Sequence, residues 1–557
     1  MHLSRSQASA SLPLRRGNIH RILVPAEIVL LALCARLSFV LATDFPLQDG
    51  GLFYTMIRDL QEAGFALPWF TSYNSAGIPF AYPPLGFYLA GLIDVLTPGS
   101  LFEVLRFLPL AMSLASLVAF YFLARTMLAS EAQANLAMLA FALLPEVFRW
   151  LIMGGGLTRS LGLLFAILAI RQAYLLYTDP STRHVLLTIA FAGCTVLSHP
   201  ELAYFAAYSI ALVYLMYARD RAGLLRSVVV ATGTLLVSAP WWAIAIARHG
   251  LAAFQVLVDD GWTWYWGLIR LLLLQVTAEP FFPVLGVVAL LGLLACLRQR
   301  QLFLPLWVLS IFVVQARGPF AKATVPLALL FGIGVTEVLL PFLNGTARVT
   351  AERWKQAGQA VGPQPGRVPH SRLAQAVVAL IVIYAIFAVT VSERALVTSL
   401  SVEERAAMRW VADNTPTSSR FLVVTSDRWG IDRTSEWFPA LAERISITTP
   451  QGAEWLPEFS PRTHRANALQ ECAAEDAACL EAWAQEWEVA FTHVYVGKRS
   501  ANSEVPSDRD PCRSLRQSLL DDPQYEMLYD NPGATVYRRI EAGPVSGLEQ
   551  RTAVRRT

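Results

Sequence analysis

Long apolar stretches separated by short polar segments dominate the chain before about residue 395. A stretch of about 20 apolar residues crosses the hydrocarbon core of a bilayer as a helix, so the pattern predicts a bundle of transmembrane helices. We expect about eleven spans, near residues 22–42, 103–124, 133–151, 157–177, 184–198, 200–217, 226–247, 281–297, 302–316, 321–343 and 373–393. The apolar run at 85–96 is too short to cross, which predicts a helix lying on the outer membrane surface.

After residue 394 the apolar positions become sparser and alternate with polar ones, as in a soluble domain. Helical periodicity at 402–413 and 464–488 is interspersed with strand-like runs at 421–425, 492–496, 526–529 and 535–539. The last two runs flank Asn531, Pro532 and Gly533, which together favour a turn. The fold class is therefore predicted to be mainly α, a polytopic transmembrane helix bundle followed by a soluble α/β domain at the C-terminus.

Basic residues lie in short clusters between the apolar runs. Because Lys and Arg are enriched in cytoplasmic loops, we expect residues 1–21 to form a cytoplasmic tail and 344–372 an inner linker within a transmembrane domain spanning 22–394. An odd number of spans then places the loop 43–84 and the domain 395–557 outside the cytoplasm. The sequence thus predicts a multi-pass integral membrane protein.

Composition supports this class and excludes others. The 557 residues are 55% hydrophobic and 16% charged, which excludes a wholly soluble enzyme, and the net charge of +3 gives no indication of nucleic-acid binding. Cys472, Cys479 and Cys512 fall in the predicted outer domain, where an oxidising compartment permits disulfides. Cys472 can pair with Cys479, or Cys512 can replace one of them, and spacing alone does not decide between these connectivities.

The outer loop 43–84 holds the sharpest candidate for chemistry. Asp49 precedes Gly50 and Gly51, which let the backbone turn without steric cost, so its carboxylate can approach a ligand closely. At the membrane surface such a carboxylate can take a proton from an attacking hydroxyl, or hold a divalent cation. Asp44 is the second candidate in this loop. The alternative interpretation is a solvated acid in an Asp-Gly turn.

Three cations on the same predicted side are candidates for holding a phosphate. Arg149 and Arg159 flank the three consecutive glycines 154–156, and Lys322 begins a later span. Guanidinium and ammonium groups bind phosphate oxygens through charge-assisted hydrogen bonds. For the arginines the alternative is that their side chains extend to lipid headgroups.

A metal site is a further candidate on this side. His199, Glu201 and Glu279, together with a carboxylate of the first loop, would supply nitrogen and oxygen ligands suited to Mg²⁺ or Mn²⁺. The sequence spacing does not establish that these residues meet, and a mechanism without metal remains equally open. A ring satisfied at a helix end is the alternative for His199.

Four tryptophans are candidates for stacking on a sugar or an acceptor. Trp262 and Trp264 follow two aspartates outside the predicted spans, and Trp429 and Trp437 lie in the C-terminal domain. For the first pair the alternative is an aromatic belt at the membrane interface, and for the second it is the core of the soluble domain.

Three segments carry a resemblance to a known family: DFPLQDGGLFY, GIPFAYPPLGFYLAGL and LPEVFRWLIMGGGLTRSLGLLF. Their layout over about residues 20–300 resembles the polytopic GT-C glycosyltransferases. Within that superfamily the chain is similar to the protein O-mannosyltransferase-like, aminoarabinose-transferase-like and oligosaccharyltransferase catalytic-subunit branches. It departs from the oligosaccharyltransferases in having no carboxylate in GGGLTRS and no Trp-Trp-Asp-Tyr-Gly segment.

The resemblance implies a membrane enzyme that transfers a sugar, with inversion, from a polyprenyl-phosphate or polyprenyl-diphosphate donor to a glycan, lipid or protein acceptor at the outer face. It also implies that an aspartate of the first outer loop is catalytic or orients the acceptor, and Asp49 matches that position. Glu279, which ends VTAE, is similar in place to a metal-proximal glutamate of oligosaccharyltransferases. A transporter or lipid flippase and a noncatalytic membrane scaffold remain as alternatives.

Overall fold

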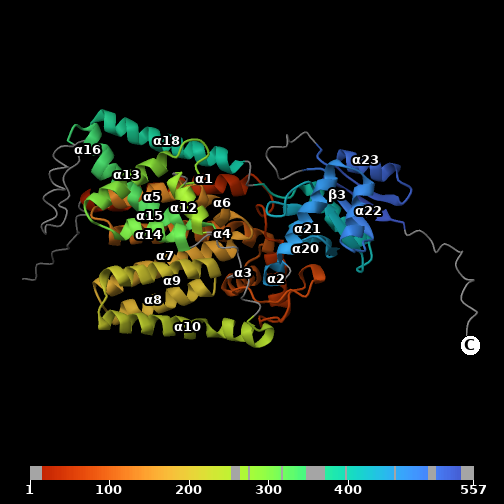
Figure 1. The fold of residues 1–557 in the computed structure, drawn as a ribbon, viewed down its shortest axis with the longest axis horizontal. Coiled ribbons are helices and arrows are strands. Elements are labelled where there is room, and N and C mark those ends of the chain that lie inside the picture. Colours follow the sequence, from red (N-terminus) through yellow and green to blue (C-terminus); the bar gives the residue numbers. More distant parts are fainter. Residues whose placement is uncertain are drawn as a thin grey trace, which may run out of the picture.

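The computed structural model describes residues 16–251, 264–273, 276–314, 318–346, 371–394, 398–456, 459–499 and 510–540. The chain forms a long bundle of helices with a smaller α/β domain at one end of it (Figure 1). Both parts were expected from the pattern of apolar positions. The fold is mainly helical, as predicted.

Six helical segments among the described residues are long and apolar enough to cross a membrane. They are α1 (Arg16–Leu41), α4 (Leu101–Met127), α7 (Gly156–Thr178), α10 (Arg221–His249), α15 (Pro319–Ile333) continued by η2 (Gly334–Leu339) and α16 (Leu340–Leu343), and α18 (Arg372–Arg394). Shorter helices fall on the other predicted spans, namely α5 (Glu131–Leu143), α8 (Thr182–Val196), α9 (Pro200–Tyr217), α13 (Val284–Arg298) and α14 (Phe303–Val314). Eleven crossings therefore remain a prediction.

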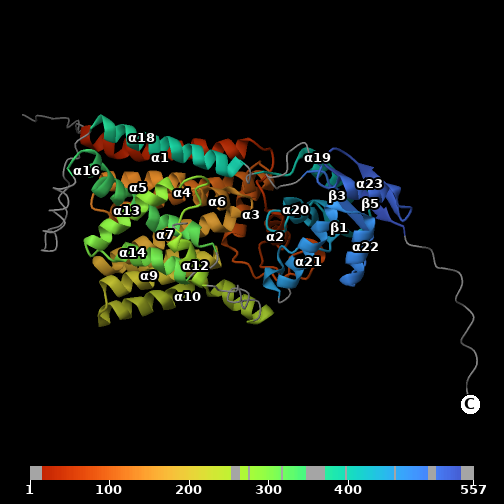
Figure 2. The ribbon, with the colours of Figure 1, turned by 45° about the horizontal axis from the view of Figure 1, so that its top comes forward.

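The bundle is packed around α7, which contacts α4, α8 and α9. On one flank α1 and α18 lie together (Figure 2). Close helix approach depends on small residues, as is common in membrane bundles. At Gly292 of α13 a β-carbon would collide with the carbonyl oxygen of Leu330 in α15, so these two helices meet backbone to backbone. The result is a closely packed bundle, one end of which faces the C-terminal domain.

The long first loop contains more regular structure than the sequence analysis recognised. It forms α2 (Gly51–Glu62) and a short turn η1 (Tyr73–Ser75) before α3 (Leu85–Leu96). Helix α2 was missed, although its buried residues Leu52, Met56, Ile57 and Leu60 recur at helical spacing. Helix α3 has the predicted bounds and packs on α2, α4 and α7. The loop is thus an ordered layer between the bundle and the C-terminal domain.

The C-terminal domain is built on a five-stranded sheet with the order β2-β1-β3-β5-β4. Strands β1 (Arg420–Val424), β2 (Ile445–Ser446) and β3 (His493–Gly497) are parallel, whereas β4 (Tyr525–Asp530) and β5 (Ala534–Arg539) are antiparallel to their neighbours. The helices are α19 (Val402–Asn414), α20 (Arg433–Ala442), α21 (Phe459–Glu471), α22 (Ala477–Glu486) and α23 (Arg513–Asp521). The sequence pattern missed α20, β2 and α23.

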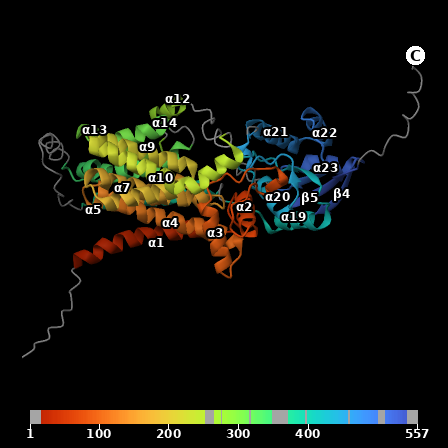
Figure 3. The same cartoon turned by 90° about the horizontal axis from the view of Figure 1, so that it is seen from below.

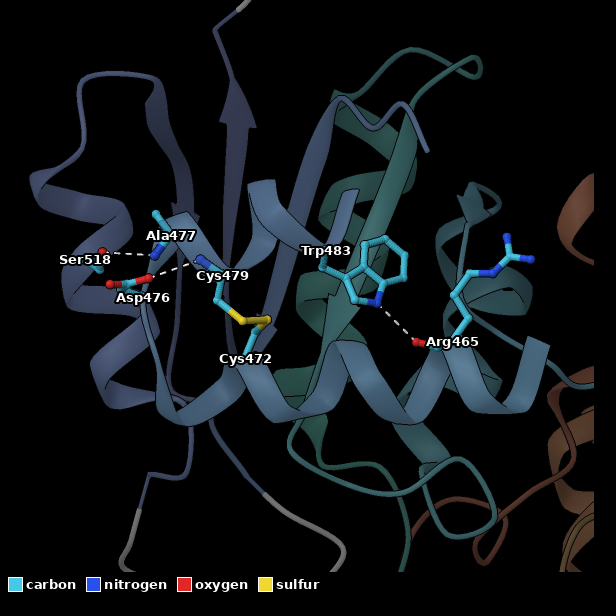
Figure 4. Close-up of a disulfide and its surroundings, with 7 residues drawn as sticks. All are labelled: Arg465, Cys472, Asp476, Ala477, Cys479, Trp483 and Ser518. Atoms are coloured by element: carbon cyan, nitrogen blue, oxygen red, sulfur yellow. Dashed lines mark hydrogen bonds between the residues drawn. A yellow bond between two sulfur atoms is a disulfide. The ribbon is translucent and has the colours of Figure 1, made fainter. Parts of the chain in front are cut away.

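A disulfide joins Cys472 to Cys479 where one long helix was expected (Figure 4). Here α21 ends, the turn η4 (Cys472–Ala474) follows, and Asp476 starts α22 by accepting a hydrogen bond from the amide of Cys479 at 3.1 Å. Cys512 is fully buried and free. Of the connectivities that the sequence left open, the structure contains the Cys472–Cys479 pair.

Candidate functional site

A cavity of about 530 Å³ lies between the bundle and the C-terminal domain, and we call it the junction cavity. Its floor is formed by helix ends of the bundle, one wall by the first loop, and its roof by the segment that follows β1. Seven residues singled out from the sequence line it: Asp49, Arg149, Arg159, His199, Glu201, Lys322 and Trp429. Residues up to 380 positions apart in sequence therefore meet in one place.

Asp49 reaches the cavity because two glycines, Gly154 and Gly155, leave room for it. Its Oδ1 accepts a hydrogen bond of 2.9 Å from the amide of Gly155, just before α7. A β-carbon on Gly155 would lie 2.5 Å from Oδ2 of Asp49, and one on Gly154 would collide with the carbonyl oxygen of Asp49. Gly154 and Gly155 thus form a cradle for the aspartate, a role that the sequence analysis did not assign to them.

Burial raises the pKa of Asp49 above its ordinary value, while the hydrogen bond from Gly155 and the positive charge of Arg159 oppose this shift. A carboxylate with a raised pKa is a stronger base than a solvated aspartate. Its second oxygen, Oδ2, is not the atom bonded to Gly155. The geometry and the electrostatics therefore suit Asp49 to accepting a proton within the cavity.

Glu436 of α20 lies next to Asp49 and was not found from the sequence. Its carboxyl group accepts hydrogen bonds from the amides of Gly50, at 2.9 Å, and Leu52, at 3.2 Å. Burial and the negative charge of Asp49 raise the pKa of Glu436 well above its ordinary value. The sequence analysis singled out only Trp429 and Trp437 in this part of the chain. No sequence pattern connects Glu436 with Gly50 and Leu52, which lie 386 and 384 positions away.

The cations of the floor come from three helices and are close to acids. Lys322, in the first turn of α15, forms a 2.6 Å ion pair with Glu201, in the first turn of α9, and its side chain is only 5% exposed. Arg159 of α7 lies over the ring of Trp150, 5.1 Å from its centroid. Arg149 of α6 (Glu146–Ile152) completes the set. This floor can accept an anion at the membrane-facing side of the cavity.

The roof is formed by the loop after β1 and by the turn η3 (Ala453–Trp455). It lies at the carboxyl end of β1, the edge of a parallel sheet at which ligands commonly bind. Trp429 belongs to it, together with Glu454 and Trp455, which the sequence analysis missed. Trp455 meets Tyr82 of the first loop edge to face, with 5.5 Å between ring centroids. Aromatic walls beside acids suit the binding of a sugar ring.

Several predicted site residues lie elsewhere. Asp44 pairs with Arg405 of α19 and does not line the cavity. Trp437 is fully buried, packs on Phe45 and donates a 2.9 Å hydrogen bond to the carbonyl of Gln48, so it is a core residue behind the Asp49 turn. Trp264 begins α12 (Trp264–Leu272), away from the lining, and Trp262 lies outside the described residues.

The proposed metal ligands are not brought together. Glu279 accepts hydrogen bonds from the amides of Leu285 and Gly286, both at 3.1 Å, and so caps the start of α13, whereas His199 and Glu201 line the cavity. Within the described ranges no group of three His, Cys, Asp or Glu side chains is placed to hold a metal ion. Glu279 is therefore apart from the other two candidate ligands, and the use of a metal ion stays a prediction.

Comparison with known proteins places this geometry in a fold class. No protein-family model matches the chain, and no curated protein sequence is similar to it. Among solved structures, ArnT from Cupriavidus metallidurans bound to undecaprenyl phosphate is 13% identical, with a TM-score of 0.52 over 94% of this chain and 98% of ArnT. The archaeal oligosaccharyltransferase AglB from Archaeoglobus fulgidus, in complex with an inhibitory peptide and a dolichol-phosphate, is 15% identical, with a TM-score of 0.52 over 86% of this chain and 70% of AglB.

The arabinofuranosyltransferase AftD from mycobacteria is also similar, at 15% identity and a TM-score of 0.52 over 92% of this chain and 40% of AftD. All three are polytopic GT-C glycosyltransferases. The chain therefore has the GT-C fold and is an integral membrane protein. The resemblance indicated by the sequence motifs is confirmed at the level of the fold.

Proposed function

We propose that this protein is a membrane-embedded glycosyltransferase that transfers a sugar from a polyprenyl-phosphate or polyprenyl-diphosphate donor to an acceptor. One observation carries the proposal: the junction cavity places the half-buried carboxylate of Asp49 beside a floor that contains Arg149, Arg159 and Lys322. The two similar structures described with undecaprenyl phosphate and dolichol-phosphate support a lipid-linked donor. A polyprenyl tail needs a hydrocarbon-facing scaffold, which the bundle provides.

The reaction that fits this arrangement is a displacement at the anomeric carbon. A hydroxyl of the acceptor attacks that carbon and gives its proton to Asp49, while the bond from the carbon to the phosphate oxygen breaks. The phosphate leaves with the bonding electrons, still attached to its lipid. The negative charge that develops on the phosphate is stabilised by Arg159, Arg149 and Lys322. Electrostatic stabilisation of this kind is often the largest single contribution to catalysis.

We propose further that the cavity faces the outer side of the membrane. The disulfide in the C-terminal domain favours an oxidising compartment, and the clusters of basic residues between the helices favour a cytoplasmic N-terminus. The cavity adjoins the same domain, so donor and acceptor would meet outside the cytoplasm. Protease protection of the C-terminal domain in sealed membrane vesicles whose cytoplasmic face points outward tests this orientation, and cleavage of the domain in such vesicles contradicts it.

The function is tested by native mass spectrometry of the purified protein in mild detergent, followed by a transfer assay with the donors so identified. We expect a co-purified polyprenyl-linked sugar, turned over by the wild type and retained unreacted by Asp49→Asn. Glu62→Gln is the matched control, because Glu62 lies on the same loop with a side chain that is 67% exposed. Only bulk phospholipid in every sample, even after candidate donors are supplied, would favour transport or scaffolding instead.

A further inference from the structure

The C-terminal domain touches the turn that carries Asp49 through a buried acid. Helix α20 packs directly on α2, and the two lie side by side at the junction of bundle and domain (Figure 3). Glu436 of α20 is only 4% exposed, and its carboxyl group faces the first turn of α2. An acid buried this deeply requires partners, and it finds them in the backbone of the other domain.

We infer that Glu436 is a positioning residue for Asp49: its carboxyl group holds the amides of Gly50 and Leu52 and so fixes the turn that presents Asp49 to the junction cavity. This inference rests on the glycosyltransferase function proposed above. It assigns to the C-terminal domain a part in assembling the active site, beyond forming its roof. It also makes the site a composite of two parts of the chain.

The first step of the argument is that α2 begins without a cap of its own. Its N-cap is Gly50, which has no side chain to accept the free amides at the helix start. Gly50 has a φ of 136°, a conformation that strains any other residue, so a capping side chain cannot simply take its place. Glu436 supplies the missing acceptor from a segment 386 residues away.

The second step is that Glu436 itself has little freedom. The hydroxyl of Tyr73 donates a 2.5 Å hydrogen bond to its carbonyl oxygen. The indole of the next residue, Trp437, is fully buried and bonded to the carbonyl of Gln48, which directly precedes Asp49. Gly51 is needed for this approach, because a β-carbon there would lie 2.7 Å from the carbonyl oxygen of Glu436. Two adjacent residues of α20 therefore form hydrogen bonds with the backbone on both sides of Asp49.

The third step concerns which substitutions preserve the contact. Oε1 of Glu436 alone lies within hydrogen-bonding distance of both amides, 3.1 Å from Gly50 and 3.2 Å from Leu52. A glutamine can place its carbonyl oxygen at the position of Oε1 and keep the bond to Leu52, but its NH₂ group then replaces Oε2, 2.9 Å from the amide of Gly50, and cannot accept from it. An alanine removes both bonds. The pair Glu436→Gln and Glu436→Ala thus separates partial loss of the contact from complete loss.

The experiment measures hydrogen–deuterium exchange and transfer on the full-length protein in detergent. In Glu436→Ala we expect faster exchange in the peptide that contains residues 48–56 and a fall in kcat of about 10- to 100-fold, with the KM for donor changed less than about 3-fold. In Glu436→Gln, which keeps the acceptor for Leu52, we expect exchange and kcat to lie between those of the wild type and of Glu436→Ala, with kcat lowered by no more than about 10-fold. The control is Glu486→Ala, an exposed glutamate of α22 in the same domain.

Exchange and kcat in Glu436→Ala that equal those of the wild type would overturn the inference. So would a glutamine variant as impaired as the alanine variant, because the acceptor kept for Leu52 would then have no effect. If the alanine variant does not fold, Glu436→Asp takes its place, since the shorter side chain withdraws the acceptor but keeps the acid. If exchange responds as expected while no variant, including the wild type, transfers any sugar, the contact stands and the proposed function fails.

Discussion

The floor and the roof of the junction cavity differ in charge and in how their residues are held. The floor presents Arg149, Arg159 and Lys322 beside Glu146 and Glu201, whereas the roof presents Asp432, Glu436 and Glu454 beside Arg433. Cations at the membrane side suit a phosphate whose lipid lies in the bilayer. Acids and tryptophans on the opposite side suit the sugar and the acceptor, which carry hydroxyl groups.

This difference indicates a division of labour between two parts of the chain. The floor would hold the leaving phosphate, and the roof would shape the space for the acceptor. Asp49 lies between them on a turn that is held by the hydrogen bonds from Gly155 to Asp49 and from Gly50 to Glu436. With this division, changes in the floor affect donor binding and the rate of transfer together. Changes at the roof that leave the Asp49 turn undisturbed affect transfer much less.

The largest effect is expected from removing the central cation of the floor. Arg159 influences Asp49, Glu146 and Glu201 electrostatically, so it is close to several groups of the cavity. In Arg159→Gln we expect kcat/KM to fall by roughly 10²- to 10³-fold, because a positive charge that stabilises the leaving phosphate is lost. The measurement is steady-state transfer with the donor identified by mass spectrometry.

The control for this variant is Arg183→Gln, at the exposed start of α8 away from the cavity. It should leave kcat/KM unchanged within error. Equal losses in the two variants would show that the effect comes from general destabilisation. An Arg159 variant with full activity would contradict the role of the floor as the phosphate site.

A methyl group added on each side of the cavity gives the second test. Gly155→Ala, in the floor, would push its β-carbon to 2.5 Å from Oδ2 of Asp49, whereas Gly430→Ala, in the roof, places its β-carbon in open space. We expect about a 10²-fold loss of kcat in the first, because displacing a catalytic group by about 1 Å has such a cost, and no more than about a 3-fold change in the second. Transfer assays on both variants measure this, and a roof variant as slow as the floor variant would erase the distinction.

The floor was largely predictable from the sequence, and the roof was not. Five residues of the floor lie at helix ends on one predicted side of the membrane, so counting the spans was enough to group them. They are Arg149, Arg159, His199, Glu201 and Lys322. The physical reason is that each predicted span crosses the membrane once, so the position of a residue along a span indicates its depth in the bilayer. The α3 helix was found for the same reason, being too short to cross.

The roof depends on the packing of the C-terminal domain against the first loop, which no local sequence pattern encodes. Glu436, Glu454 and Trp455 reach the cavity only because α20 and η3 pack on the first loop, through contacts such as the reciprocal hydrogen bonds between Asn74 and Ser446 at 2.7 and 2.8 Å. Asp44 and Trp437 were assigned to the site for the chemistry of their side chains. Their neighbours Arg405 and Phe45 instead tie the two parts together.

A smaller effect is expected on the pH dependence of transfer. As the proposed base, Asp49 must be ionised, and burial raises its pKa. As the pH is lowered, kcat/KM should therefore begin to fall at a higher pH than it would with a solvated aspartate. The charged and polar groups that face it are the amide of Gly155, Arg159 and Glu436. Since Arg159 lowers this pKa, Arg159→Gln should move the acid limb to higher pH. Glu436→Gln replaces a carboxyl group whose own pKa is raised well above its ordinary value, so it should move the limb much less. A limb that moves in the roof variant and stays in the floor variant would reverse this assignment.

The smallest effect on transfer is expected from the disulfide, which lies in the C-terminal domain among residues that do not line the cavity. Replacing Cys472 and Cys479 by alanine should lower the free energy of unfolding of that domain by about 2–3 kcal/mol, because a cross-link over a short loop restricts the unfolded chain. The kcat of transfer at low temperature should stay at the wild-type value. Denaturant titration followed by hydrogen exchange in this domain measures the first quantity, and the transfer assay measures the second.

The disulfide variant also tests how independently the roof is supported. Cys512 is fully buried, and burial raises the pKa of its thiol, which disfavours the thiolate needed for exchange with the Cys472–Cys479 bond. Peptide mapping under nonreducing conditions should therefore recover the Cys472–Cys479 pair and a free Cys512. If removing the disulfide lowers kcat as strongly as Gly155→Ala does, the end of the domain far from the cavity controls the Asp49 turn. The roof then contributes to catalysis and does not only shape the cavity.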